Sequence, residues 1–231
     1  VDKAVPGENL PPLHPWCRST TISTLNKQIM DKLKRRARDP VTGKTYLVPA
    51  NMTYNEWYDK YVKSDPNENL AVKKFKNKYS DKKQYEKYKH VLGKNVPKSF
   101  AKFQDLKYNN SNEWNLLKSY KMAIQTGELT PLADFELYKK VSREIDKTLV
   151  GITTSNGIVI TGKSNHFIAR TSGSVEQKRN GVEIAESLKT LTNPKKVDDE
   201  VHNSNGASQR FIGNGSAVTV NPVTGNLIQV N

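Results

Sequence analysis

The chain has 231 residues, a mass of 26.1 kDa and one cysteine, Cys17. Its 37 Lys and Arg residues against 23 Asp and Glu residues give a net charge of +14, which predicts a polyanionic partner such as nucleic acid. No stretch approaches the ~20 apolar residues of a membrane span, the first residues lack the pattern of a signal peptide, and one thiol excludes an internal disulfide.

Charge and composition both change along the chain. Residues 1–150 contain 29 Lys and Arg against 17 Asp and Glu, whereas residues 151–231 contain 8 against 6. The first part is rich in Lys, Tyr and Asn, and the second is rich in Gly, Ser, Thr and Val. We therefore predict an α+β chain in three parts: an extended tether at 1–23, a basic helical region at 24–150 and an α+β domain at 151–231.

The beginning of the chain combines a proline-rich segment with a basic one. Four prolines within residues 1–18 predict an extended tether. Residues 24–38 place apolar side chains at helical spacing between basic ones, and the turn signal at 40–43 ends the predicted helix. The densest positive charge in the chain lies there, and it is interpreted either as a solvated helix face or flexible arm, or as a phosphate contact. Its residues are Lys32, Lys34, Arg35, Arg36 and Arg38.

The middle of the chain predicts a small all-helical bundle. Thr53 and Glu56 form the sequence pattern of a capping box at the start of one helix. Tyr and Trp side chains interleaved with Lys suggest either base stacking on single-stranded nucleic acid or a core stripe, and their spacing of three and four favours the core. Further helices are predicted at 68–79, 80–92 with Asp81 as its cap, 97–107, 111–126 and 131–149.

The last third changes to alternating patterns that predict a helix followed by an antiparallel meander. A short apolar strand is expected at 158–160, a turn at 162–165, a strand or helix at 166–170 and a helix at 182–191. The strands of the meander are predicted at 209–212, 217–221 and 227–230.

His166 and Arg170 are the candidate chemical groups of this last third. A histidine is suited to proton transfer at neutral pH, and a guanidinium can hold a phosphate with two hydrogen bonds. If Gln209 and Arg210 pack alongside, the set matches a metal-independent ribonuclease, in which the 2′-hydroxyl of RNA is the nucleophile. The alternative is that His166 and Arg170 form an ordinary structural pair at the surface or in the core and have no catalytic role. His202 is a second candidate acid or base. We expect neither a metal site nor a cofactor.

A resemblance to a known family is carried by the first part of the chain. Residues 13–21, which spell LHPWCRSTT, resemble the HPxCRxTT signature of Mu-F-like phage minor head, or head-morphogenesis, proteins. Residues 48–57 resemble a segment that follows the signature in several of them. The family usually has a second cysteine where this chain has Ser19. The resemblance implies phage portal or other head proteins as partners.

Residues 157–231 resemble a second group, the toxin-like nuclease domains of the Barnase, EndoU, colicin and RelE superfamily. The resembling stretches are 166–170, 179–194, 208–213 and 218–228. The resemblance implies a helix-plus-antiparallel-sheet fold and RNA cleavage without metal. It assigns catalytic roles to His166, Arg170, Gln209 and Arg210, and a hydroxyl on the sheet face to Thr219. We also expect Lys163 and Arg179 to contact nucleic acid.

The resulting prediction is a ribonuclease-type toxin or effector domain attached to a phage head protein. Its substrate would be RNA, with tRNA as one candidate, and an acidic immunity protein would be its inhibitor.

The alternative is a non-enzymatic head component that binds DNA or portal protein through basic helices. A third hypothesis is the tail of an ADP-ribosyltransferase-like head protein. We expect the protein in the virion or the host cytoplasm. The enzyme hypothesis requires His166, Arg170 and Arg210 to converge in one cleft.

Overall fold

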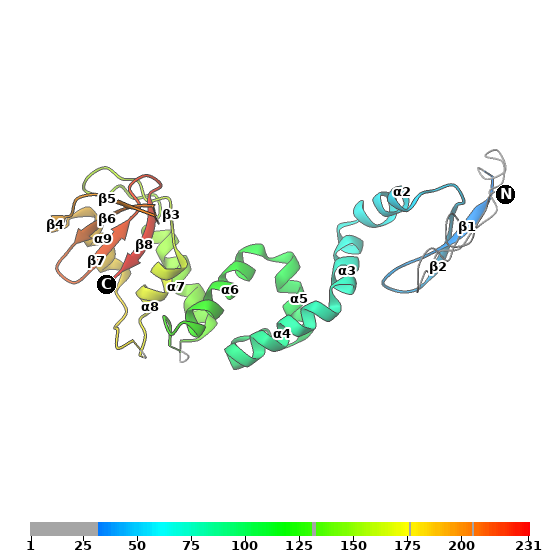
Figure 1. Ribbon diagram of the computed structural model, residues 1–231, viewed down its shortest axis with the longest axis horizontal. Coiled ribbons are helices and arrows are strands. Elements are labelled where there is room, and N and C mark those ends of the chain that lie inside the picture. Colours follow the sequence, from blue (N-terminus) through cyan, green and yellow to red (C-terminus); the bar gives the residue numbers. More distant parts are fainter. Residues whose placement is uncertain (1–31, 131–132, 176, 205) are drawn as a thin grey trace. The chain divides into compact units, whose positions relative to one another are not determined.

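The computed structural model describes residues 32–130, 133–175, 177–204 and 206–231, and these form an α+β chain, as predicted (Figure 1). They belong to two compact units that divide between Asn77 and Lys78, and each unit is described by itself. The predicted tether with its HPxCRxTT motif, and residues 24–31 of the predicted basic helix, lie outside the described residues.

The first unit consists of a β-hairpin and short helices. The hairpin joins β1 (Lys34–Arg38) to β2 (Thr45–Pro49). It is followed by α2 (Tyr54–Tyr58), the π-helical turn η1 (Asp59–Lys63) and α3 (Pro66–Lys76). The capping box predicted from Thr53 and Glu56 is confirmed, because each side chain accepts a hydrogen bond from the backbone N–H of the other residue.

The prediction of a basic helix over 24–38 is wrong for its described part, because residues 34–38 form a strand. The turn after the strand explains the difference. The Asp39 carboxylate accepts hydrogen bonds of 2.8 Å from the N–H groups of Val41 and Thr42, and Gly43 has a positive φ of 72°. This turn reverses the chain, and the backbone hydrogen bonds of the basic segment then go to β2 instead of to a helical turn.

The hairpin separates its basic side chains onto two faces. Arg35 pairs with Val48 and Ala37 pairs with Tyr46, and directly paired residues lie on the same face of an antiparallel ladder. Val48 is buried in a small core with Trp57, Val62 and Val72. The alternate residues of β1, which are Lys34, Arg36 and Arg38, therefore lie on the opposite, exposed face.

The second unit begins with helices and ends with a sheet. Its helices are α4 (Lys78–Leu92), the 3₁₀ turn η2 (Gly93–Asn95), α5 (Phe100–Asn109), α6 (Ser111–Gln125), α7 (Phe135–Thr148), α8 (Asn165–Ser172) and α9 (Ile184–Thr192). Its strands are β3 (Gly162–Lys163), β4 (Lys196–Val197), β5 (Val201–Asn203), β6 (Gly206–Ile212), β7 (Ala217–Val220) and β8 (Asn226–Val230).

The sheet has the order β3-β8-β7-β6-β4, and β5 pairs with a further part of β6. The predicted meander of β6, β7 and β8 is confirmed as antiparallel. The sheet as a whole is mixed, because β3 pairs with β8 in parallel inside the segment predicted as a turn at 162–165. Residues 158–160 form no strand: Val159 makes an isolated bridge to Thr153, and Ile160 is buried.

One hydrophobic core joins the helices to the sheet. Buried side chains of the helices, such as Trp114 and Tyr138, belong to the same cluster as Phe167 on α8 and Phe211 and Val218 on the sheet. The structure therefore has no division near residue 150, where the composition changes. The helices α4–α7 pack with the sheet module, whereas α2 and α3 pack with the hairpin. The change of composition near residue 150 therefore marks the change from helices to strands, and not a boundary between two hydrophobic cores.

Most of the predicted aromatic core stripe is confirmed. Tyr88, Trp114 and Tyr120 are buried, and Tyr88 stacks on Trp114 with ring centroids 5.5 Å apart. Trp57 is buried in the first unit. Tyr54 is an exception, because it is 59% exposed although it has the spacing of a core residue.

Asp81, predicted as a helix cap, is instead fully buried inside α4. Its carboxylate accepts hydrogen bonds from Gln104 (2.8 Å), the Lys107 ammonium (2.6 Å) and the Tyr108 hydroxyl (2.9 Å). Burial raises the pKa of Asp81, but the three hydrogen bonds and the charge of Lys107 outweigh it, so the pKa is lowered overall. This network fastens α4 to α5.

We expect Asp81→Asn to destabilise the protein by about 1–3 kcal/mol at pH 7, because the half-buried Lys107 ammonium loses its counter-ion and the hydrogen bonds to the buried carboxylate lose their charge. The lowered pKa means that the wild-type carboxylate stabilises the fold above its unfolded-state pKa, near 4, and that this stabilisation is lost as the pH falls through the folded-state pKa. Urea unfolding of the wild type and of Asp81→Asn from pH 7 to pH 3 measures the difference in their free energies of unfolding. The difference between the proteins should stay constant down to about pH 5 and shrink in more acidic solution. Glu144→Gln, at an exposed 3.9 Å ion pair, is the control.

Candidate functional site

Helix α8 carries the two principal candidate residues on one face. Ser164 caps the helix by accepting a hydrogen bond from the N–H of Phe167, and Gly173 ends it with a φ of 81°. Phe167 and Ile168 are buried in the core of the second unit. His166 and Arg170 are four residues apart and therefore lie on the same side of the helix.

His166 contacts a carboxylate from the loop after α6. Its Nδ1 lies 3.0 Å from Oε1 of Glu128, and about a third of each side chain is exposed. An ionised carboxylate has no proton to give, so Nδ1 is the donor in this contact. The other ring nitrogen, Nε2, is then the atom through which a neutral His166 accepts a proton.

A tight loop at 173–181 brings Arg179 to the same place. Ser174 and Arg179 exchange backbone hydrogen bonds of 2.9 and 2.8 Å, and Lys178 between them has a positive φ of 50°. Gly173 and Gly181 close the loop so tightly that a Cβ on Gly173 would lie 2.5 Å from the backbone nitrogen of Gly181. The loop therefore fixes the direction from which Arg179 approaches the site.

The loop is fastened to the segment that carries Glu128. The Ser174 hydroxyl donates to the Gly127 carbonyl (2.8 Å), and an Arg179 guanidinium nitrogen donates to the Glu128 carbonyl (2.9 Å). The carboxylate that contacts His166 is thus positioned by hydrogen bonds to its own backbone segment. We call Glu128, His166, Arg170 and Arg179 the α8 cluster.

The two guanidinium groups of the α8 cluster repel one another electrostatically. Burial lowers the pKa of Arg179, the positive charge of Arg170 lowers it further, and Glu128 acts in the opposite direction. Arg170 donates to the side-chain oxygen of Asn231 (3.0 Å), and its Nε is buried without a hydrogen-bond partner. Among the described residues, no carboxylate oxygen lies within 4 Å of a guanidinium nitrogen of Arg170 or Arg179. These two like charges therefore favour the binding of an anion.

Arg210 and Thr219, also predicted as site residues, lie on the other face of the sheet from α8. Phe211 pairs with Val218, and both are buried on the face covered by α8. The neighbouring pair, Arg210 and Thr219, points to the opposite face because side chains alternate along a strand. The convergence of His166, Arg170 and Arg210 predicted from the sequence is therefore not found.

Gln209 has a structural role in place of the predicted catalytic one. Its side-chain oxygen accepts from Asn156 (2.9 Å) and its nitrogen donates to the Asp198 carbonyl (3.1 Å), which fastens two loops to β6. Lys163, predicted to contact nucleic acid, forms an ion pair with Asp146. His202 is exposed on β5, and its Nε2 lies 2.8 Å from Oε1 of Glu200.

The remaining predicted nucleic-acid contacts belong to the first unit. Lys32, Lys34, Arg35, Arg36 and Arg38 are exposed. Arg35 also donates to the Met52 carbonyl at 2.7 Å. These residues and the α8 cluster belong to different compact units.

Sequence reasoning missed Glu128 and Asn231. Glu128 follows the glycine that ends α6, in a loop that has no periodic pattern. Asn231 follows the last strand and meets Arg170 only through the fold. A glutamate next to a helix-ending glycine is too common a pattern to have identified the partner of His166.

The comparisons with known proteins bring no relative. No family model, no curated protein and no solved structure matches the chain. Among the described residues, no three His, Cys, Asp or Glu side chains gather as a metal site would require. Within the same residues, no helix combines the length and the apolar character that a membrane crossing demands.

We expect inorganic phosphate to stabilise the protein against heat more than chloride does at the same ionic strength, because the two guanidinium groups bind it in the folded state only. Each kcal/mol of binding should raise the unfolding midpoint by about 2–4 °C. Differential scanning fluorimetry measures the shift. Arg179→Gln should abolish the phosphate-dependent shift, and Arg143→Gln, at an exposed site on α7, should keep it. Equal shifts in both variants would contradict an anion site at the α8 cluster.

Proposed function

We propose that the chain is a ribonuclease that cleaves RNA at the α8 cluster without a metal ion. The observation that supports this most is the 3.0 Å contact between His166 and Glu128 beside two guanidinium groups that have no carboxylate partner among the described residues. The proposal keeps the function expected from the sequence and replaces Arg210 with Arg179 and Glu128 in the catalytic set.

The side chains of the cluster match the requirements of 2′-hydroxyl attack. Nε2 of His166 takes the proton of the ribose 2′-hydroxyl, and the 2′-oxygen then forms a bond to phosphorus while the bond to the 5′-oxygen breaks. Glu128 stabilises the imidazolium that forms, since its carboxylate remains bonded to Nδ1. The leaving 5′-oxygen takes its proton from water or from the imidazolium. The products are a 2′,3′-cyclic phosphate and a 5′-hydroxyl.

The guanidinium pair supplies the electrostatic part of the reaction. Negative charge increases on the non-bridging oxygens as the 2′-oxygen attacks, and fixed cations stabilise that charge more strongly in a partly buried site than in water. Arg179 is partly buried and held by hydrogen bonds to Gln177 and to the Glu128 carbonyl. A fixed guanidinium needs little reorganisation during the reaction.

The biological setting of this proposal follows from the two resemblances. A toxin-like nuclease of the Barnase, EndoU, colicin and RelE group, attached to a Mu-F-like phage head protein, would act in the virion or in the host cytoplasm. RNA would be its substrate, portal or other head proteins its assembly partners, and an acidic immunity protein its inhibitor. The mixed α+β architecture of the second unit is compatible with this group.

The direct test incubates the full chain with total tRNA and with a synthetic single-stranded RNA in EDTA. We expect cleavage that leaves 2′,3′-cyclic phosphate ends, and His166→Ala should lower the rate by about 10²–10⁴-fold because the proton acceptor is lost. Glu128→Gln should lower it by a smaller factor, since the imidazolium loses a charged partner. Mass spectrometry of the product ends identifies the reaction.

His202→Ala is the matched control and should leave the rate unchanged, because this exposed histidine lies on β5 and contacts Glu200. Arg210→Ala distinguishes the two faces of the sheet. If it abolishes cleavage while His166→Ala does not, the reaction takes place on the other face and the α8 assignment is wrong. Intact RNA at high protein concentration would count against the enzyme altogether.

A second candidate function is a non-enzymatic head component that binds DNA. It is favoured by the exposed hairpin face, on which Lys34, Arg36 and Arg38 lie side by side. Replacing all three with Gln should lower the slope of log affinity for duplex DNA against log salt by about 2–3, since each neutralised phosphate contributes about 0.9. Fluorescence anisotropy at several salt concentrations measures the slope. An unchanged slope would remove the hairpin from the DNA contact.

A further inference from the structure

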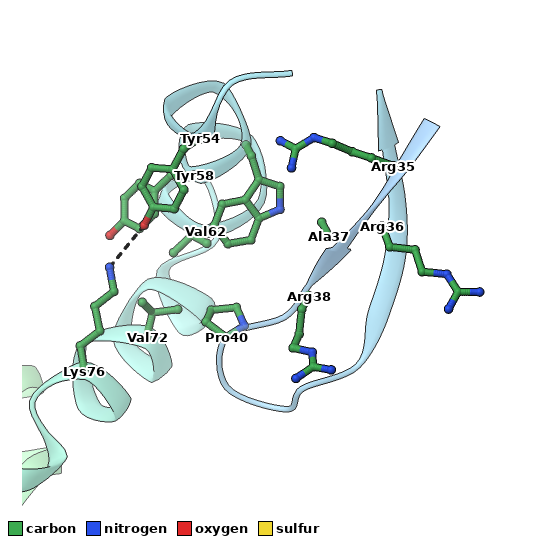
Figure 2. Close-up of a pocket in the computed structure, with 11 residues that line it drawn as sticks. Arg35, Arg36, Ala37, Arg38, Pro40, Tyr54, Tyr58, Val62, Val72 and Lys76 are labelled. Carbon is green, nitrogen blue, oxygen red and sulfur yellow. Dashed lines mark hydrogen bonds between the residues drawn. The ribbon is translucent and has the colours of Figure 1, made fainter. Parts of the chain in front are cut away.

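A cavity of about 370 Å³ in the first unit lies between β1 and the helices α2 and α3 (Figure 2). Its apolar lining includes Ala37, Val62 and Val72, which belong to the small core of the unit or pack against it. Every described residue that lines it lies within 35–76, in the first unit.

Aromatic rings form one wall of this cavity. Tyr54, Trp57 and Tyr58 line it, and Tyr54 lies 5.6 Å from Trp57 and 6.0 Å from Tyr58 between ring centroids. Trp57 is buried and donates its indole N–H to the Tyr46 hydroxyl at 2.6 Å, so it is part of the core. Tyr54 is different, because it is 59% exposed and stacks on Tyr58 at an interplanar angle of 30°. Its ring offers an exposed surface at the mouth of the cavity.

The charged residues that line the cavity are all basic. Arg35, Arg36 and Arg38 come from β1, and of these Arg35 lies on the face of the hairpin that carries the buried Val48. Lys76 comes from the end of α3, where its ammonium lies 3.5 Å from the Tyr54 hydroxyl and 5.3 Å from the Tyr58 ring centroid. Figure 2 shows Arg35 extending from β1 toward the helices. No Asp or Glu is among the described residues that line the cavity.

The carboxylates of residues 32–77 lie outside the lining of this cavity. Glu56 on α2 is turned back onto Thr53, and this contact lowers the pKa of Glu56. Asp39, Asp65 and Glu68 line a separate cavity on the side of Tyr61. There, burial and the charges of Asp39 and Asp65 raise the pKa of Glu68. Within residues 32–77, carboxylates therefore line the cavity beside Tyr61 and basic side chains line the cavity beside Tyr54, which favours an anion at Tyr54.

We infer that this cavity binds an unpaired nucleotide of a single-stranded nucleic acid, with its base stacked on Tyr54 and its phosphates held by Arg35 and Lys76. Each base has a π-face that stacks on an aromatic ring, and the adjacent cations track the backbone. A duplex keeps the faces of its bases stacked inside and offers its phosphates and base edges. Tyr54 would therefore distinguish single strands from duplexes, which the exposed arginines alone would not. The site is independent of the α8 cluster, because none of its residues belongs to the second unit.

The test uses the full chain and a fluorescein-labelled dT12 oligonucleotide, which has no 2′-hydroxyl and is not a substrate for the proposed ribonuclease. Tyr54→Leu should weaken dT12 binding by about tenfold, as expected for the loss of one stacked base, and should leave the affinity for a 12-base-pair duplex unchanged. Tyr54→Trp should retain or strengthen dT12 binding. Fluorescence anisotropy at a fixed salt concentration measures both affinities.

Tyr79→Leu is the matched control, because Tyr79 is 73% exposed, has the Lys83 ammonium 4.6 Å from its ring centroid and belongs to the second unit. It should bind dT12 as the wild type does. Equal losses in both tyrosine variants, or a parallel loss of duplex binding in Tyr54→Leu, would overturn the stacking site. Poly-L-glutamate provides a further test, since it has the charge of a polyanion without bases. If it displaces dT12 from the wild type and from Tyr54→Leu with equal efficiency, charge alone explains binding and the stacking site is wrong.

The outcome is separable from that of the ribonuclease test. His166→Ala should bind dT12 with wild-type affinity, so loss of cleavage in that variant reports on the α8 cluster only. Circular dichroism and tryptophan fluorescence of Tyr54→Leu establish that the first unit remains folded, since Trp57 lies in its core.

Discussion

The hydrophobic core shared by the helices α4–α7 and the sheet is the constraint on which the second unit depends. Tyr120 and Tyr138 lie in this core with ring centroids 5.5 Å apart, and Phe167 and Phe211 belong to the same cluster. Burying these side chains forces α8 against the helical layer. A single sheet cannot cover its own apolar face, so the helices supply the apolar surface that packs against it.

The α8 cluster is a consequence of this packing. Its histidine and one arginine come from α8, its carboxylate comes from the loop after α6, and its second arginine comes from the loop at 173–181. Two hydrogen bonds to the backbone of Gly127 and Glu128 align the loops, so the polar geometry is set by main-chain contacts. Residues far apart in the sequence thereby form one charged group at the surface of a common core.

Local signals in the sequence predicted local structure well. The capping box at Thr53 and the alternation over 209–230 each identified an element, because capping and strand periodicity act within a few residues. The basic segment before Asp39 was wrongly predicted as a helix, since the turn that pairs it with β2 competes with its helical spacing. The partner of His166 was beyond prediction, because the contact spans 38 positions and depends on tertiary packing. Arg210 was misplaced because alternation along β6 defines two faces without saying which one α8 covers.

The residues of the α8 cluster come from both sides of residue 150, so a fragment must include both parts of the chain to keep the cluster intact. Glu128 lies before the change of composition near residue 150, and His166, Arg170 and Arg179 lie after it. A fragment cut at the compositional boundary would carry the imidazole and guanidiniums but leave the carboxylate behind, with the apolar face of the sheet uncovered. The transferable module is therefore the whole second unit from Lys78 onward, and exchange of such a module between chains would have to include its helices.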